Sequence, residues 1–140
     1  MATPDAEWLV GPGRWDDFRE QTPPFLTTMA AGSGGRYLAD DILAEIDAGR
    51  MSAWLSVCGA VVTCVMVTQV IHYPRFKALR YVGIAGKIPK NWSAALTTIA
   101  ASAYKDHGCR RLEALHPPGR YGVLRFLGWR TFHVLSEATL

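Results

Sequence analysis

The chain has 140 residues, 49% of them hydrophobic and 19% charged, and its formal net charge is +3. This length and composition fit one globular domain with a sizeable core, and they exclude a disordered chain, which would contain far fewer apolar residues. The mildly basic balance does not by itself indicate a nucleic-acid partner, because such a partner usually requires a concentrated basic face.

The first 35 residues differ in character from the rest. They are rich in Pro, Gly and Thr, and they contain two tryptophans and two phenylalanines. We interpret residues 1–35 as an irregular arm, with a short strand at Trp8–Val10 and a helical turn between Trp15 and Glu20. Because the aromatic side chains must bury apolar surface on something, the arm either wraps its own domain or contacts a partner.

From residue 36 onward the pattern is regular and predicts a folded domain over 36–140. Leu38, Ile42 and Ile46 recur at helical spacing, whereas 61–73 is β-branched. In chain order the predicted elements are a helix over 38–49, strands over 53–59, 61–73 and 76–86, a helix over 91–108, a strand over 109–116, a helix over 119–129 and a strand over 130–140. This order predicts an α+β fold, with a mixed, mostly antiparallel central sheet and helices on both faces.

Neither a secretion signal nor a membrane span is expected. The N-terminus carries acidic residues early and has no apolar segment of the signal type. The longest apolar run, Ala60 to Ile71, is interrupted by polar residues and is too short to span a bilayer. The three cysteines lie in apolar, strand-like stretches and are expected to be reduced and packed. We therefore expect a soluble, intracellular chain.

The predicted elements resemble the GNAT acyltransferase fold over about Asp40–Leu140. The segment Gly108–Glu113 follows the long helix as in that family, and Leu127-Gly128-Trp129 fits its Leu-Gly-Phe-like step before the last strand. The sequence is also similar to small GNAT-like proteins of tailed bacteriophages, through Tyr73–Lys77 and Gly119–Gly122. Some phage proteins of this fold are virion components, including an internal virion protein of podoviruses.

A GNAT-type enzyme holds the diphosphate of acyl-CoA with backbone N–H groups where a turn opens a helix, because orphan donors and the helix dipole attract an anion. Related enzymes place glycines in this turn, whereas this chain has fewer of them, and Pro89 removes a donor. The resemblance assigns cofactor binding to Gly86, Lys87, Lys90, Asn91 and Ser93. The alternative is an ordinary connection, in which Asn91 caps the helix and the lysines are solvated.

The resemblance also implies a base that deprotonates an amine and an acid that reprotonates a thiolate. The strand over 76–86 has no carboxylate, so the base candidate is His72, with Tyr73 beside it and Glu113 on the following strand. The acid candidate is Tyr121, which lies one helical turn before the position where the family places its tyrosine. His72 and Tyr121 are the predicted catalytic residues. The alternatives are a hydrogen-bonded histidine at the rim of the sheet and a tyrosine that covers the sheet.

Other groupings of reactive residues are weaker. His107, Cys109 and His116 are close in sequence, but no fourth ligand accompanies them, and no metal site is predicted. Cys109 as a nucleophile would need an activating neighbour, and we interpret it as a packed thiol. Arg110 and Arg111 are adjacent on a predicted strand, which places one guanidinium on each face of the sheet.

Three functions are left open. The departures at the cofactor turn favour a virion structural or assembly protein with a degenerate acyl-CoA site and no cofactor, acting in the bacterial host cytoplasm and the virion. Residues 1–35 would then contact other virion subunits or copies of the chain. The alternative is an active N-acyltransferase that uses acetyl-CoA, for which a gap between the fourth and fifth strands is the structural clue. Nucleic-acid binding through scattered arginines is the third hypothesis.

Overall fold

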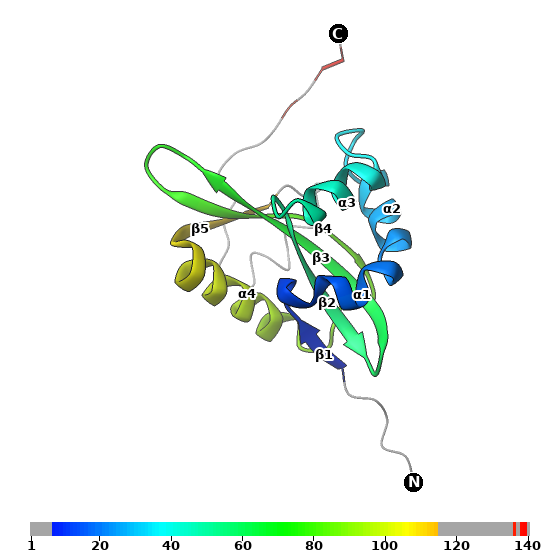
Figure 1. Cartoon of the computed structure of the whole chain (residues 1–140). Helices are drawn as coiled ribbons and strands as arrows, with labels where there is room; N and C mark the ends of the chain where they lie inside the picture. Colours follow the sequence, from blue (N-terminus) through cyan, green and yellow to red (C-terminus); the bar gives the residue numbers. More distant parts are fainter. Residues whose placement is uncertain (1–6, 115–135, 137, 140) are drawn as a thin grey trace.

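The computed structural model describes residues 7–114, 136, 138 and 139. Within them, strands form one sheet and helices pack against it (Figure 1). The strands are β1 (Glu7–Val10), β2 (Ser52–Cys58), β3 (Val61–His72), β4 (Lys77–Gly86) and β5 (Cys109–Ala114). The α-helices are α1 (Trp15–Phe18), α2 (Pro23–Ala31), α3 (Ala39–Asp47) and α4 (Trp92–His107), and 3-10 turns flank α1 at Pro12–Arg14 and Arg19–Gln21.

The sheet has the order β1-β2-β3-β4-β5, with antiparallel pairing from β1 to β4 and parallel pairing between β4 and β5. It is therefore mixed and mostly antiparallel, which confirms the predicted fold class. β4 contains a bulge at Val82, because Thr68 pairs with Tyr81 while Val67 pairs with Gly83. A bulge bends its strand and increases the local twist, so the end of β4 that leads to α4 is rotated relative to its beginning.

Helices cover both faces of the sheet (Figure 1). Alternate residues of β3 serve the two cores, since successive strand side chains point to opposite faces. Val65 and Val67 belong to the core under α2 and α3, and Met66 belongs to the core under α4. Ile42 of α3 and Ile99 of α4 are fully buried at the centres of their clusters. The buried face predicted for α3 is confirmed at Ile42 and Ile46, whereas Leu38 lies at the N-cap and is 72% exposed.

Residues Glu7–Ala31 pack on their own sheet. β1 pairs with β2 over its whole length, from Glu7 opposite Cys58 to Val10 opposite Leu55. The aromatic and aliphatic side chains of this segment that lie in the first core cluster are Val10, Trp15, Phe18, Leu26 and Met29. Of the two ways expected for this segment to bury its aromatic surface, it uses the contact with its own domain.

α2 is a helix that the sequence pattern did not predict, because its residues read as an irregular Pro- and Thr-rich stretch. Pro23 and Pro24 occupy the first two helical positions. There the backbone N–H is not needed, and the fixed φ of proline suits the helix. Leu26 and Met29 are three residues apart and therefore lie on one face of the helix, which is buried against the sheet. Tertiary packing of this face stabilises the helix.

The elements predicted between residues 38 and 114 are all present within a few residues of their expected ends. The predicted helix over 119–129, the predicted strand over 130–140 and the motifs within them lie outside the described residues. Among the described helices, none is both long and apolar enough to cross a membrane.

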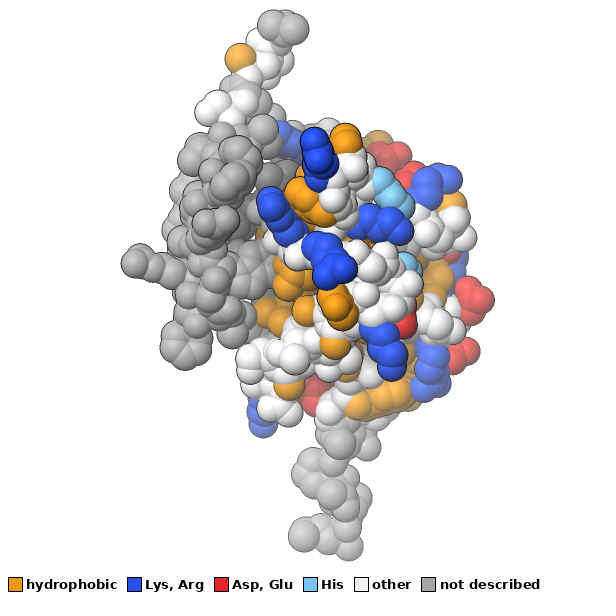
Figure 2. Space-filling model, turned by 90° about the vertical axis from the view of Figure 1, so that its left-hand side faces the viewer, with side chains coloured by type: hydrophobic (Ala, Val, Ile, Leu, Met, Phe, Trp, Pro, Cys, Tyr) orange, Lys and Arg blue, Asp and Glu red, His pale blue; other side chains and the backbone are white. Residues whose placement is uncertain are grey.

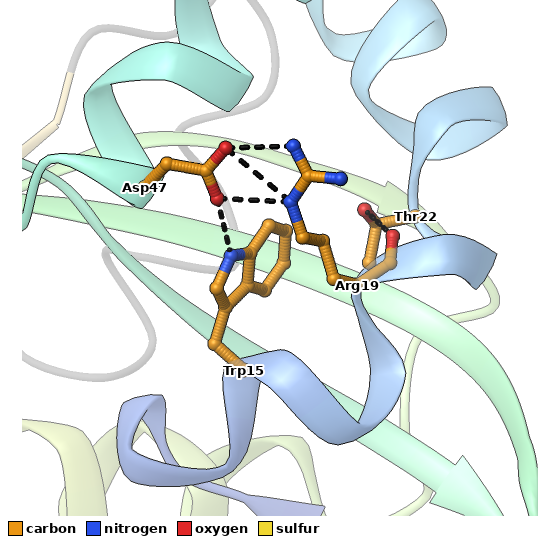
Figure 3. A network of polar contacts seen from close by, with 4 residues as sticks. All are labelled: Trp15, Arg19, Thr22 and Asp47. Atoms are coloured by element: carbon orange, nitrogen blue, oxygen red, sulfur yellow. Dashed lines mark hydrogen bonds and ion pairs between the residues drawn. The ribbon is translucent and has the colours of Figure 1, made fainter.

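A polar network joins α1 and the turn after it to the C-terminal end of α3 (Figure 3). The carboxylate of Asp47 accepts a hydrogen bond from the Trp15 indole N–H at 2.9 Å and three from the Arg19 guanidinium, the shortest at 2.7 Å. The Thr22 hydroxyl donates to the Arg19 carbonyl at 2.7 Å. Hydrogen bonds from Arg19 and then from Trp15 lower the pKa of Asp47 to about 2. The ionised carboxylate therefore stabilises the fold.

We expect Asp47→Asn to lower the free energy of unfolding by about 1 kcal/mol at pH 7, the scale of a partly exposed ion pair with an added hydrogen bond. The pKa of Asp47 is lower in the folded chain than the ordinary 3.8, so the stabilisation is complete above about pH 4 and is lost as the pH falls towards 2. Urea unfolding of both proteins between pH 7 and pH 2 measures the difference. Asp16→Asn removes the same charge from α1 and serves as the control; equal effects of the two substitutions would contradict this account.

Candidate functional site

The residues predicted to bind a cofactor lie together in the connection from β4 to α4. Gly86 ends β4, Asn91 occupies the N-cap position of α4, and Ser93 lies in its first turn. Lys87 and Lys90 lie between them, and both side chains are exposed. The structure therefore brings together the five residues that the resemblance assigned to one turn.

The first turn of α4 has backbone donors without a partner. Asn91 makes no side-chain cap, although its carbonyl accepts the Ala95 N–H at 3.0 Å. Within the described residues, the N–H groups of Ser93 and Ala94 form no hydrogen bond. Orphan donors at the positive end of a helix dipole are a suitable place for an anion. The alternative, in which the side chain of Asn91 caps the helix, is not observed, because this side chain makes no cap hydrogen bond.

Gly86 is required by the chain itself. Its φ is +102°, a conformation that residues with a side chain rarely adopt. A Cβ there would meet the Thr63 carbonyl oxygen, and it would lie 2.7 Å from Cε1 of Phe25 and 3.0 Å from Cα of Cys64. The next N–H, that of Lys87, donates to the same Thr63 carbonyl at 2.8 Å. The N–H of Lys87 is therefore already used and is not available to an anion.

A small cavity of about 200 Å³ adjoins the first turn of α4. Asn91 and Ala94 line it from the helix, and Glu7 and Ser56 line it from β1 and β2. The Ser56 hydroxyl donates to the Glu7 carboxylate at 2.8 Å. A negative charge in this cavity repels a phosphate, so an anion at the helix end is better placed on the side of the two lysines.

The expected gap between β4 and β5 remains a prediction. Described pairing runs from Lys77 opposite Cys109 to Tyr81 opposite Ala114, where the described part of β5 ends. The bulge at Val82 directly follows the last of these pairs along β4.

The structure does not bring His72 to the cofactor turn. His72 is exposed at the end of β3 and pairs with Lys77 at the start of β4. Gly86 is nine strand residues further along, about 30 Å away at 3.3 Å per residue. His72 instead lines a separate cavity of about 750 Å³, with Lys77 and His107 among its other residues. Tyr121, the predicted acid, lies outside the described residues.

A polar cluster forms at the β4–β5 edge, and sequence reasoning had not assembled it. The Arg80 guanidinium donates to Glu113 at 2.7 Å, and the Tyr73 hydroxyl donates to the same carboxylate at 2.8 Å. The hydrogen bond to Glu113 is the largest of the contributions that raise the pKa of Tyr73. Glu113 is therefore already engaged by two donors. Only the strand register, which sets Arg80 opposite Glu113, could have revealed the cluster.

Cys64 and Cys109 do not offer a nucleophile. Cys64 is buried, and burial raises the pKa of its thiol to about 11. Burial also raises the pKa of Cys109, which packs in the core under α4. Both are therefore protonated thiols at neutral pH. In the described part of the chain, no three His, Cys, Asp or Glu side chains are placed to hold a metal ion.

Comparison with known proteins identifies the fold. No protein-family model matches the chain, and no curated protein matches it. One similar solved structure is a ribosomal-protein-alanine N-acetyltransferase from Brucella melitensis biovar Abortus 2308, with a TM-score of 0.61, 12% identity and 96% of each chain covered. A second is a GCN5-related N-acetyltransferase from Ralstonia eutropha JMP134, with a TM-score of 0.64, 13% identity and coverage of 96% of this chain and 97% of that chain. A third is an aminoglycoside acetyltransferase from an uncultured soil metagenomic sample, with a TM-score of 0.64, 8% identity and coverage of 96% of this chain and 95% of that chain. The chain therefore has the GNAT fold, and the resemblance to phage proteins remains a prediction.

We expect Gly86→Ala to destabilise the folded chain by about 2–3 kcal/mol, because it adds a close contact and a strained backbone. Urea unfolding without any ligand measures this change. Gly13→Ala is the control, since nothing lies within 4 Å of its Cβ position. Unchanged stability of Gly86→Ala would contradict the structural role given to this glycine.

Proposed function

We propose that the chain binds acyl-CoA at the β4–α4 turn and acts as an N-acyltransferase. The observation that carries the proposal is the pair of N–H groups at Ser93 and Ala94, which have no partner within residues 7–114 and lie at the positive end of α4, beside Lys87 and Lys90. Two backbone donors and two ammonium groups suit the diphosphate of a CoA derivative. The position of this turn in a GNAT fold adds support.

We assign the following roles to residues of the chain. Ser93 and Ala94 bind one phosphate through their N–H groups, and Lys87 and Lys90 neutralise its charge. Bound acyl-CoA supplies the activated acyl group. Glu113 is already held by Arg80 and Tyr73, and β4 has no acidic residue, so the proton of the attacking amine passes to water. Tyr121 is the proposed donor to the departing thiolate.

The second candidate is a virion or assembly protein with a degenerate acyl-CoA site. Two observations favour it: Pro89 offers no N–H, and the Lys87 N–H is already bonded to Thr63. This candidate also requires an N-terminal arm that is free to contact other subunits. Because Glu7–Ala31 pack on their own sheet, these residues are not free to reach other subunits. We therefore favour the acyltransferase.

Isothermal titration with acetyl-CoA tests the proposal. We expect micromolar binding that weakens at least about tenfold, or about 1.4 kcal/mol, when Lys87→Glu and Lys90→Glu are combined, because the substitutions reverse the charge beside the phosphate. The matched control is Lys105→Glu, near the other end of the same helix and about 20 Å away at 1.5 Å per residue, which should leave the affinity unchanged.

The absence of heat at millimolar acetyl-CoA would refute acyl-CoA binding and leave the assembly protein as the better candidate. Binding without turnover of any amine acceptor would separate the two halves of the proposal. This result would support acyl-CoA binding at the β4–α4 turn and contradict the proposed transfer reaction.

A further inference from the structure

The end of β3, the start of β4, the end of α4 and the start of β5 lie together at the end of the sheet far from the β4–α4 turn. The hairpin between His72 and Lys77 joins β3 to β4, Lys77 pairs with Cys109 at the start of β5, and α4 ends at His107. The cationic residues that these segments bring to this end, here called the basic surface, are Arg75, Lys77, Lys105, Arg110 and Arg111. All five are exposed. Figure 2 shows Lys and Arg side chains gathered on the side of the molecule that carries α4 and β5.

The basic surface has no carboxylate partner within the described residues. Elsewhere, ion pairs at 2.7–3.0 Å are formed by Arg14, Arg19, Arg50 and Arg80. Of the acids on the same segments as the basic surface, Glu113 is paired with Arg80, and Asp106 accepts the Ser102 hydroxyl at 2.9 Å. Five cations therefore face solvent at one end of the molecule with little compensation, which gives this end a positive potential.

Two of these cations are held by aromatic rings. The guanidinium carbon of Arg111 lies 4.1 Å from the centre of the Phe76 ring, and that of Arg110 lies 5.5 Å from the centre of the Tyr104 ring. A guanidinium that contacts a ring through its face keeps its in-plane N–H groups free for a phosphate. Arg110 contacts α4 through Tyr104, and Arg111 contacts the hairpin through Phe76. Arg110 is the extra residue of a bulge in β5, because Lys77 pairs with Cys109 and Ala78 pairs with Arg111, so the simple alternation expected for the two arginines does not hold.

Exposed rings lie among the cations. Tyr104 is 61% exposed and Tyr73 is 37% exposed, although large hydrophobic side chains are mostly buried in this chain. Tyr73 also packs on Phe76, with ring centres 5.2 Å apart. Aromatic faces next to arginines and lysines are the combination with which proteins bind single-stranded nucleic acid, because bases stack on the rings while cations contact the phosphates.

We propose that the basic surface binds single-stranded nucleic acid. Because Arg110 lies against Tyr104 of α4 and Arg111 lies against Phe76 of the hairpin, the cations extend from the helix to the hairpin, and a flexible strand can follow that path more readily than a stiff duplex or a flat lipid surface can. Phosphates contact Arg75, Lys77 and the two arginines, and bases stack on Tyr104. The surface is separate from the cofactor turn, because α4 alone is about 24 Å long.

Fluorescence anisotropy with a labelled single-stranded oligonucleotide of about 20 nucleotides tests this proposal on the full chain. We expect micromolar affinity at low salt, with a slope of log K against log salt between about −2 and −3.5, because each phosphate contact on a single strand contributes about −0.7. The double variant Arg110→Gln/Arg111→Gln should weaken binding at least tenfold and reduce the slope. Tyr104→Ser should weaken binding several-fold with an unchanged slope, because it removes stacking and no charge.

The charge-matched control is Lys87→Gln/Lys90→Gln, which should bind the oligonucleotide like the unmodified chain while losing acetyl-CoA affinity. The arginine variant should behave in the opposite way, so that failure of either proposal is seen independently. Absence of binding at low salt, or equal binding by the arginine variant, overturns the proposal. Tighter binding to a duplex of the same length, or equal competition by polyglutamate, overturns the single-stranded nucleic-acid assignment.

Discussion

The position of Gly86 is the constraint on which the candidate acyl-CoA site depends. The extra residue of a bulge in β3 is Thr63, since Ser56 pairs with Cys64 while Val57 pairs with Val62. The Thr63 carbonyl lies against Gly86 and accepts the Lys87 N–H at 2.8 Å. These contacts fix the direction in which the chain leaves the sheet, and α4 begins a few residues later. The end of β4 therefore sets where the chain turns toward the first turn of α4, in which the amides of Ser93 and Ala94 have no hydrogen-bond partner among the described residues.

This arrangement changes what the turn can offer to an anion. A glycine-rich turn presents a series of backbone donors, but here the first donor is used by Thr63 and Pro89 has none. The exposed charges of Lys87 and Lys90 then carry a larger share of the binding, and salt screens these charges more strongly than it screens buried hydrogen bonds. Binding at this turn would accordingly depend more on ionic strength than binding in a cradle made of backbone alone.

Most of the fold could be predicted from the sequence, because hydrophobic period, β-branched runs and helix boundaries are local signals. α2 could not, since the signal of Pro23 and Pro24 is ambiguous until a sheet is present to bury Leu26 and Met29. The β4–α4 turn was predicted as a cofactor site from residues that are adjacent in the chain, and the structure places these residues together. The cluster of Tyr73, Arg80 and Glu113 and the basic surface were missed, because both depend on strand register and on which segment ends meet in space.

The dipole of α4 accounts for some of the cations of the basic surface, and the others need a different explanation. The C-terminal end of α4 carries partial negative charge, which favours Lys105 near that end and Arg110 just beyond it. Arg75 and Arg111 gain nothing comparable, since the first lies in the hairpin and the second lies over Phe76 of the hairpin. Exposed cations without a carboxylate add little to stability. Their concentration beside exposed tyrosines is therefore better explained by an anionic, stacking ligand than by the needs of the fold.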